Sequence, residues 1–473
     1  MMASQNISFD SIPSSIRKPG KYFEFNTKLA VRTLPGNLQK VLMLGQKLVA
    51  GTQAAMAPVD VFSDEQAAQL FGHGSQLHLM VRAAIKANPY LQLTAVAIAD
   101  PAGAQASGTT TLAGTATGSG VLTLWVGANR VDVAVNSGDT AATVAAALAA
   151  AVTARPDIPV TSAAVAAVVT HTCYHKGTLG NDIKLVASCT APGLTATVVT
   201  LAGGTLDPDY TATLAAVAGA GHNIIVAPLS SQTQLTVLRT HLDFVSGPME
   251  QRGALGVFGW PGSLATGTTL AGQINGGRIT GAWHRSSLRL PCEIAAAYAA
   301  VLASEEDPAR PLNTLELVGM DVTSIDQRPI RTEQENALNN GLTPLEIGPG
   351  DRVQIVRAIT TYTKDPQGVT DVSLLDVTTI RTLDYVRKAV RERIALRFPR
   401  EKLSERTPDK LRSETLDVLF KLEELEIVEA VEANKDGVLA ERDGQDVNRV
   451  NLKIPCDVVN GLHIVAGRID LLL

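Results

Sequence analysis

Four residues near the middle of the chain are of the types that bind zinc. His171, Cys173 and His175 are each separated by one residue, and Cys189 follows further along the chain. Zinc sites usually hold four thiolate or imidazole ligands in a tetrahedron, often supplied as two tight pairs. Single-residue gaps inside a strand place the first three side chains on one face, a pattern more typical of ordinary strand residues with a buried thiol. We therefore expect that the chain binds no metal and no other cofactor.

Two glycine-rich stretches and three histidines are the remaining candidates for enzyme chemistry. Residues 219–221 (GAG) precede an apolar run, whereas a phosphate-binding loop needs a strand before it and a helix after it. Residues 259–263 (GWPGS) follow an apolar run but lack the spacing of a nucleophile elbow. His222, His241 and His284 lie at no spacing that selects a serine partner. We expect that the chain is not an enzyme; the alternative is an α/β hydrolase or a nucleotide-binding enzyme.

The composition indicates a folded chain of several domains. The sequence has 473 residues, of which 45% are hydrophobic and only 4% aromatic, so its cores must consist mainly of Ala, Val, Leu and Ile. A chain of this length usually forms about two to four domains. The formal net charge of -5 argues against nucleic acid as the main partner, because proteins that bind phosphate backbones are usually basic.

The start of the chain, its apolar stretches and its cysteines indicate a cytosolic protein. Residues 1–10 lack a basic segment followed by an apolar run, so we expect no signal peptide. The richest apolar stretch, residues 141–154, is too short to span a membrane. Widely spaced cysteines in a cytosolic chain are expected to be free thiols, and here they are Cys173, Cys189, Cys292 and Cys456.

Short apolar runs alternate with amphipathic stretches in residues 39–101 and again in residues 207–320. Such runs are typical of strands buried on both faces, and their alternation with helices favours a parallel sheet. These two parts therefore predict one α/β core domain with a mostly parallel sheet, split by an insertion. The expected strands are residues 41–44, 93–98, 223–227, 254–258 and 315–318. The expected helices are residues 62–86, 211–218, 231–244 and 293–303.

Residues 102–206 form the insertion, which is rich in Thr, Ala, Gly and Val and almost free of charge. Within it, valines alternate with other residues over residues 131–136, which indicates a half-buried strand, and residues 195–200 are a second candidate. The side chain of Asp139 or Thr140 is expected to cap the Ala-rich helix that follows. This segment is predicted to be a small, mainly β module attached to the core.

Residues 321–460 are strongly charged and are expected to form a separate α+β domain. One helix is indicated by the apolar stripe Leu383, Val386, Val390 and Ile394, and a second by Leu411, Val418, Leu422 and Leu425. Strands are expected at residues 450–455 and 463–471. Basic residues off the first stripe are typical of a solvated face, but also of a docking surface for an acidic partner, and these are Arg387, Lys388 and Arg391.

Both ends of the chain contain strand-like pieces outside the predicted domains. Residues 1–38 include the run Tyr22, Phe23, Glu24 and Phe25, and residues 461–473 finish in three leucines. Extended ends of this kind fray, pair within their own chain, or add to the edge of a neighbour's sheet.

The order of several stretches along the chain resembles that of the tail sheath proteins of Mu-like contractile-tailed bacteriophages. More distantly, it is similar to the sheaths of related contractile injection systems. No single stretch is diagnostic, and the resemblance rests on their order over most of the chain. The stretches are residues 9–25 (FDSIPSSIRKPGKYFEF), 32–37 (RTLPGN), 41–45 (VLMLG), 120–127 (GVLTLWVG), 139–144 (DTAATV), 342–345 (LTPL) and 377–387 (VTTIRTLDYVR).

This resemblance implies a structural role. Sheath subunits stack as hexameric rings in a helical polymer around a tail tube, between a baseplate and a tail terminator. Their contraction drives the tube through the host envelope for genome ejection. The implied location is the virion, after assembly in the bacterial cytoplasm, with no nucleic acid partner and no direct insertion into a membrane.

The resemblance also implies a fold and a set of contacts. The core domain would have a subtilisin-like fold without a catalytic set, and the inserted module would lie on the outside. The terminal arms would exchange strands between neighbouring subunits. That exchange would use Tyr22, Phe23, Glu24, Phe25, His463, Val465, Ile469 and Leu471. Part of a tube-facing surface would comprise Arg387, Lys388 and Arg391. Another tail or baseplate protein is a second alternative, although tube proteins are usually much shorter.

Overall fold

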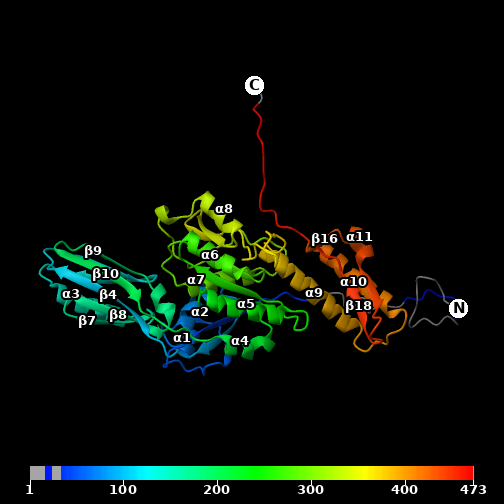
Figure 1. The fold of residues 1–473 in the computed structure, drawn as a ribbon, viewed down its shortest axis with the longest axis horizontal. Helices are drawn as coiled ribbons and strands as arrows, with labels where there is room; N and C mark the ends of the chain where they lie inside the picture. Colours follow the sequence, from blue (N-terminus) through cyan, green and yellow to red (C-terminus); the bar gives the residue numbers. More distant parts are fainter. Residues whose placement is uncertain (1–15, 24–33, 472–473) are drawn as a thin grey trace.

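The computed structural model describes residues 16–23 and 34–471. Three folded parts follow one another along the longest axis of the molecule (Figure 1). The inserted module lies at one end, the α/β core lies in the middle, and a helical part from the end of the chain lies at the other. The chain is therefore an α/β protein of several domains.

An eight-stranded sheet forms the centre of the core, in the order β15-β14-β13-β12-β11-β1-β3-β2. The six strands from β14 to β3 are parallel, and the two edge strands are antiparallel to their neighbours. Strands β1, β11 and β12 are almost wholly buried because helices cover both faces. The strands are β1 (Lys40–Gln46), β2 (Pro58–Asp60), β3 (Gln92–Ile98), β11 (Ile224–Val226), β12 (Leu255–Trp260), β13 (Ile279–Trp283), β14 (Thr343–Gly348) and β15 (Arg352–Ile355).

Glycines of β12 show how the two helical layers are placed. A Cβ atom on Gly259 would meet the backbone of α7, whereas a Cβ atom on Gly256 would meet leucine side chains of α5. Residues three apart in a strand point to opposite faces, so α7 and α5 lie on opposite sides of the sheet. The core helices are α1 (Asp64–Phe71), α2 (Gln76–Ala87), α4 (Thr211–Val217), α5 (Gln232–Ser246), α6 (Leu264–Ile274), α7 (Pro291–Ser304) and α8 (Arg331–Asn339).

The core differs from the sequence-based expectation in three places. The strand expected at residues 315–318 is wrong as a regular strand, because this run lies beside β15 but forms only an isolated bridge, between Glu316 and Gln354, and two further main-chain hydrogen bonds. The large sheet also continues past residue 320 into β14 and β15, so a boundary at that residue cuts through the chain that builds the sheet. The helix expected over residues 62–86 is two helices, because the turn between them includes Gly72 and Gly74 at positive φ.

The inserted module consists of two antiparallel sheets and one helix. Its sheets have the orders β10-β4-β8-β7 and β6-β5-β9. The side chain of Thr140 accepts a hydrogen bond from the amide of Thr143 and caps α3, whereas Asp139 accepts one from the Asn136 amide in the preceding turn. The elements are β4 (Gln105–Gly114), β5 (Gly120–Val126), β6 (Asn129–Val135), α3 (Ala141–Thr153), β7 (Val160–Val165), β8 (Val168–Lys176), β9 (Leu185–Cys189) and β10 (Leu194–Ala202).

The last part of the chain has a small apolar cluster of its own, formed around two long helices. Of the first predicted stripe, Val386 and Val390 are buried, but Leu383 is 38% exposed; of the second, Leu425 is exposed. The strand expected at residues 463–471 is not formed in the isolated chain. The elements are α9 (Val377–Arg397), α10 (Thr407–Glu424), β16 (Val428–Glu429), α11 (Val431–Asn434), β17 (Leu439–Arg442), β18 (Val450–Lys453) and β19 (Asp457–Val458).

Candidate functional site

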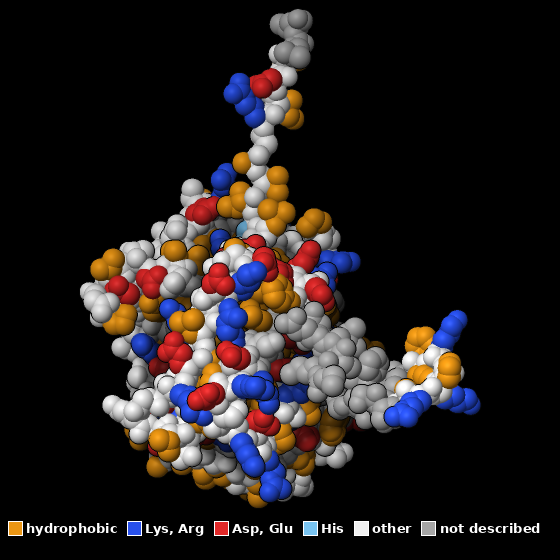
Figure 2. Space-filling view, turned by 90° about the vertical axis from the view of Figure 1, so that its right-hand side faces the viewer, with side chains coloured by type: hydrophobic (Ala, Val, Ile, Leu, Met, Phe, Trp, Pro, Cys, Tyr) orange, Lys and Arg blue, Asp and Glu red, His pale blue; other side chains and the backbone are white. Residues whose placement is uncertain are grey.

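The C-terminal segment, residues 461–471, extends away from the folded body (Figures 1 and 2). No main-chain hydrogen bond joins residues 460–471 to any other part of the chain that the structure describes. Val465, Ile469 and Leu471 are each more than four-fifths exposed. His463 is the exception, because it lies 3.7 Å from Asp376. The amides and carbonyls of this extended segment are open to solvent and free to pair with another strand, and its exposed apolar side chains are of the kind that interfaces bury.

The N-terminal arm shows the same feature over its described residues. Phe23 is 89% exposed and Tyr22 is 41% exposed. The Tyr22 hydroxyl donates only to the carbonyl of Lys18, within the arm itself. Figure 2 shows this piece of the arm carrying basic and hydrophobic side chains, set apart from the body. The other two predicted residues of the run, Glu24 and Phe25, lie outside the described residues.

A two-stranded hairpin in the C-terminal part offers open strand edges. Strands β17 and β18 pair with each other and, among the described residues, with no other strand. The turn is held by Asp443, which accepts hydrogen bonds from the amide of Gln445, the side chain of Asn451 and the amide of Asp446. These bonds lower the pKa of Asp443 to about 2. Sequence reasoning missed β17, although Asp443-Gly444 between two short alternating runs is a typical hairpin signal.

The three basic residues predicted to face a tube lie on α9, where two bond to the core and one bonds to the end of the N-terminal arm. Arg387 donates to the carbonyl of Ser246 at 2.8 Å, and Arg391 donates to the carbonyl of Gln251 at 3.2 Å. Lys388 donates to the carbonyl of Gly36 at 2.8 Å. These contacts hold the helical part against the core, and the tube-facing role stays a prediction.

The four residues weighed as zinc ligands in the sequence, His171, Cys173, His175 and Cys189, do not form one site. His171 is fully buried and bonds to the hydroxyls of Thr110 and Ser162, and burial lowers the pKa of its ring to about 4. His175 is also buried but bonds to Asp100. Both histidines are therefore satisfied by protein groups. The cysteines of the set are free thiols.

The carboxyl ends of the parallel strands, where α/β proteins usually bind ligands, are closed by the inserted module. Gln46 ends β1, and its side chain donates to Asp100 and to the carbonyl of Lys176 from β8. His175, one residue before, accepts the amide of Gln76 at 3.0 Å. These bonds join the module to the core at the end of β1.

Of the three histidines considered as partners of a serine, His284 lies near Ser287, but the two do not form a catalytic triad. The Ser287 hydroxyl donates to the carboxylate of Asp321. The ring of His284 bonds to the main-chain carbonyl of that same aspartate at 2.7 Å. A triad needs the ring between hydroxyl and carboxylate, so this arrangement does not activate the serine.

Among the described residues, no helix has the length and apolarity to cross a membrane.

Comparison with known proteins finds matches to phage tail sheath proteins along the chain. Residues 203–361 match the phage tail sheath protein central domain, and residues 369–471 match the phage tail sheath C-terminal domain. The chain is 34% identical to the Mu-like prophage FluMu tail sheath protein of Haemophilus influenzae, over 99% of this chain and all of that protein.

Solved sheath structures share the fold at low sequence identity. A sheath tail protein from Desulfitobacterium hafniense is 15% identical, with a TM-score of 0.52 over 94% of this chain and 97% of that one. The contracted sheath of the extracellular contractile injection system PVC is 12% identical, with a TM-score of 0.51 over 97% and 98%. The chain is 34% identical to a tail sheath protein over nearly its whole length and matches both sheath domains. It therefore belongs to the phage tail sheath protein family.

Proposed function

We propose that the chain is the structural subunit of a contractile phage tail sheath. It polymerises as stacked hexameric rings around a tail tube, between a baseplate and a tail terminator, and it contracts to drive the tube through the host envelope. Its place is the virion, after assembly in the bacterial cytoplasm. The observation that carries the proposal is the C-terminal segment, which has no main-chain partner within the described part of the chain, on a chain that is similar to a sheath protein along its whole length.

Strand exchange is the proposed link between subunits. Residues 461–471 and the arm at Tyr22 and Phe23 supply free main-chain groups, and the β17–β18 hairpin of a neighbour supplies open edges. Main-chain hydrogen bonds depend little on sequence and contribute about 1 kcal/mol each, so a run of them in every subunit forms a continuous tether. This tether stays intact while the rigid α/β bodies rotate and repack, which is how we propose that the sheath contracts.

The proposed division of the chain follows the sequence, with one change. The arms are residues 1–38 and 461–473, and the inserted module is residues 102–206. The core comprises residues 39–101 and extends from residue 207 to about residue 361, where the match to the central sheath domain ends. We further propose that this core is a non-catalytic relative of the subtilisin-like fold, supported by its parallel sheet between two helical layers.

Electron microscopy of full-length protein and proline variants tests strand exchange. The full chain is expected to form hollow tubes with a helical surface. Val465→Pro and Ala466→Pro remove main-chain donors that point in opposite directions along an extended strand. If the segment pairs at one edge, one variant loses the tubes and the other keeps them; if it pairs at both, both lose them.

Ile469→Ala is the control, because it removes a side chain and keeps the main-chain donor. Tubes that survive both proline variants and deletion of residues 461–473 would contradict strand exchange. Monomers that also fail to assemble on a co-expressed cognate tube would contradict the sheath function.

The tube-facing role of the α9 cations is also proposed, and Arg391 gives its cleanest test. Its side chain is exposed, unlike those of its two companions, so charge reversal disturbs the fold least. Arg391→Glu is expected to impair assembly on tubes and to spare tube-free polymers. Equal loss of assembly on tubes and of tube-free polymers would contradict the tube-facing role.

A further inference from the structure

The two-stranded ribbon of β16 and β19 carries two carboxylates directly opposite each other. The antiparallel register pairs Glu429 with Asp457. Opposite residues of such a pair place their side chains on one face, with Cβ atoms about 4.5–5.5 Å apart, so like charges there repel. Both residues are exposed, and neither forms an ion pair with any other described residue. Two more exposed carboxylates, Glu424 and Glu426, lie at the end of α10 and in the turn that follows, so negative charge gathers here without a cation.

A small hollow beside the ribbon has room for one cationic group. Glu429 and Asp457 both line it, and its other walls include Asn434 and Pro455. Its volume of about 10 Å³ is close to that of one water-sized sphere. In the described part of the chain, these two carboxylates belong to no group of three metal-ligating side chains. The hollow therefore fits the compact ammonium group of a lysine better than a planar guanidinium or a metal ion.

The N-terminal arm carries cations that have no partner. Arg17, Lys18 and Lys21 are exposed, and none of them forms an ion pair with another described residue. Figure 2 shows this piece of the arm apart from the body, with its basic side chains pointing into solvent. The C-terminal segment differs, because Arg468 there bonds to Asp470 at 2.6 Å. Of the two ends of the chain, the N-terminal arm is thus the one whose charge complements the ribbon.

We propose that the N-terminal arm of a second subunit docks on the β16–β19 ribbon and places the ammonium group of Lys18 or Lys21 between Glu429 and Asp457. The inference rests on the proposed strand exchange and adds which end of the chain binds where. Attraction between the arm and the ribbon directs the arm to its neighbour, and repulsion between the two carboxylates disfavours a ribbon without an arm.

Charge reversal on each side, followed by mixing, tests the docking. One protein carries Glu429→Lys and Asp457→Lys, and the other carries Lys18→Glu and Lys21→Glu. Each protein alone brings like charges together and is expected to need an at least about tenfold higher concentration than the wild type to form tubes. The equimolar mixture should form tubes at the wild-type concentration, because every arm then meets a ribbon of opposite charge. Sedimentation and electron microscopy of the full-length proteins measure both results.

The matched control carries Glu335→Lys and Glu405→Lys. Both residues are exposed and form no ion pair with other described residues, so this variant changes the net charge equally and should assemble as the wild type does. If each reversed protein forms tubes by itself as readily as the wild type, the docking is wrong, although the wild-type tubes still support the sheath function. If a chain with all four changes forms tubes but the mixture does not, the arm docks on its own subunit, which also overturns the proposal.

Discussion

At the scale of single residues, burial favours the neutral forms of the buried thiols and of His171. Burial raises the pKa of the Cys173 thiol to about 12 and raises the pKa of Cys292 still further. The pKa of His171 falls for the same reason, because a charged ring is costly to bury. Cys292 lies in the first turn of α7, where a thiolate would otherwise be stabilised, yet its side chain is wholly buried. Such groups pack the interior and are poor nucleophiles.

Thiol labelling should separate the four cysteines into two pairs. At pH 8 the native protein is expected to react at Cys189 and Cys456, which are partly exposed, and not at Cys173 and Cys292. All four should react in urea. A thiol reagent followed by peptide mass analysis checks this. Rapid labelling of Cys292 in the native chain would contradict the closed interior and reopen the enzyme alternative.

Acid should destabilise the inserted module through His171. The pKa of this ring is 6.5 in the unfolded chain and about 4 in the folded one, so only the unfolded chain takes up the proton between these values. The contribution of neutral His171 to the free energy of unfolding is therefore fully present above pH 6.5 and is lost as the pH falls toward 4. His171→Gln should flatten this dependence by about 3 kcal/mol. Urea denaturation across the range checks the slope, and His241→Gln should change it less.

At the scale of elements, α9 joins the helical part to the core. Asp384 on this helix receives two hydrogen bonds from Arg278, at 2.6 and 2.9 Å, and a third from Arg387. The Arg278 and Asp384 side chains are each only 19% exposed. The hydroxyl of Tyr385 also donates to the carbonyl of Pro35, so the end of the N-terminal arm is fixed at the same joint. This joint sets the angle between the two parts.

Removing the charge of Asp384 should loosen this joint. Asp384→Asn leaves two guanidinium groups without their carboxylate, which is expected to cost about 2–4 kcal/mol. Limited proteolysis should then cut the chain between the core and α9, and urea denaturation should show earlier loss of the C-terminal part. Asp132→Asn breaks the exposed pair with Arg130 and should change neither readout. An unchanged cleavage pattern in Asp384→Asn would show that packing alone fixes the joint.

At the scale of the whole molecule, the inserted module is attached through two connecting segments that lie side by side. The amide of Ala104 donates to the hydroxyl of Thr205, and the amide of Thr205 donates to the carbonyl of Ala104. Both matched sheath segments lie almost wholly outside residues 102–206. The module thus ends where it begins, and the core sheet is built without it.

Excision of the module should leave a folded subunit that still assembles. Replacing residues 104–205 by two glycines joins two chain ends that already lie together. Without His175, the Gln76 amide and the Asp100 carboxylate would bond to water instead. Electron microscopy is expected to show tubes of smaller outer diameter. Insoluble protein would instead show that the core needs the module to cover the ends of its strands.

Sequence alone determined the features that depend on local pattern. The continuous apolar run at residues 41–44 predicted β1, because a strand buried on both faces is apolar at every position. The alternation over residues 131–136 predicted β6, because side-chain direction along a strand repeats every two residues. Thr140 was one of the two residues expected to cap α3, the other being Asp139. A cap is predictable because it depends only on the residues at the start of its own helix. Order of stretches along the chain indicated the family, because such order survives divergence.

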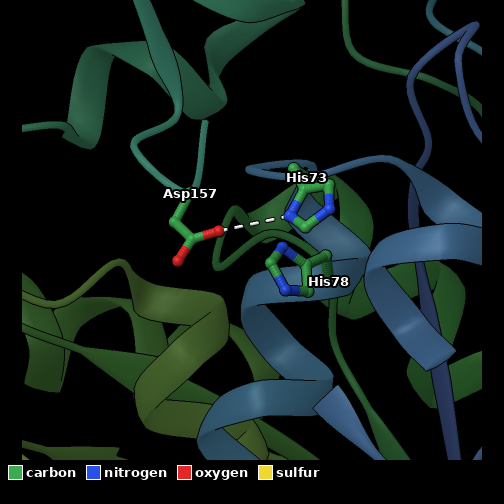
Figure 3. Close-up of side chains that lie close together, drawn as sticks. All are labelled: His73, His78 and Asp157. Atoms are coloured by element: carbon green, nitrogen blue, oxygen red, sulfur yellow. Dashed lines mark hydrogen bonds and ion pairs between the residues drawn. The ribbon is translucent and has the colours of Figure 1, made fainter. Parts of the chain in front are cut away.

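Only the tertiary structure decided which distant segments meet. Strands β14 and β15 gave too little local signal. β14 joins the large sheet by pairing with β13, some sixty residues earlier, and β15 joins it by pairing with β14. The same holds for His73 and Asp157, which are 84 residues apart and bond to each other where the module touches the core (Figure 3). Their approach follows from Gly74, whose missing Cβ leaves room for the carbonyl of Pro156. Contacts of this kind arise from packing in three dimensions, which no repeat along the chain records.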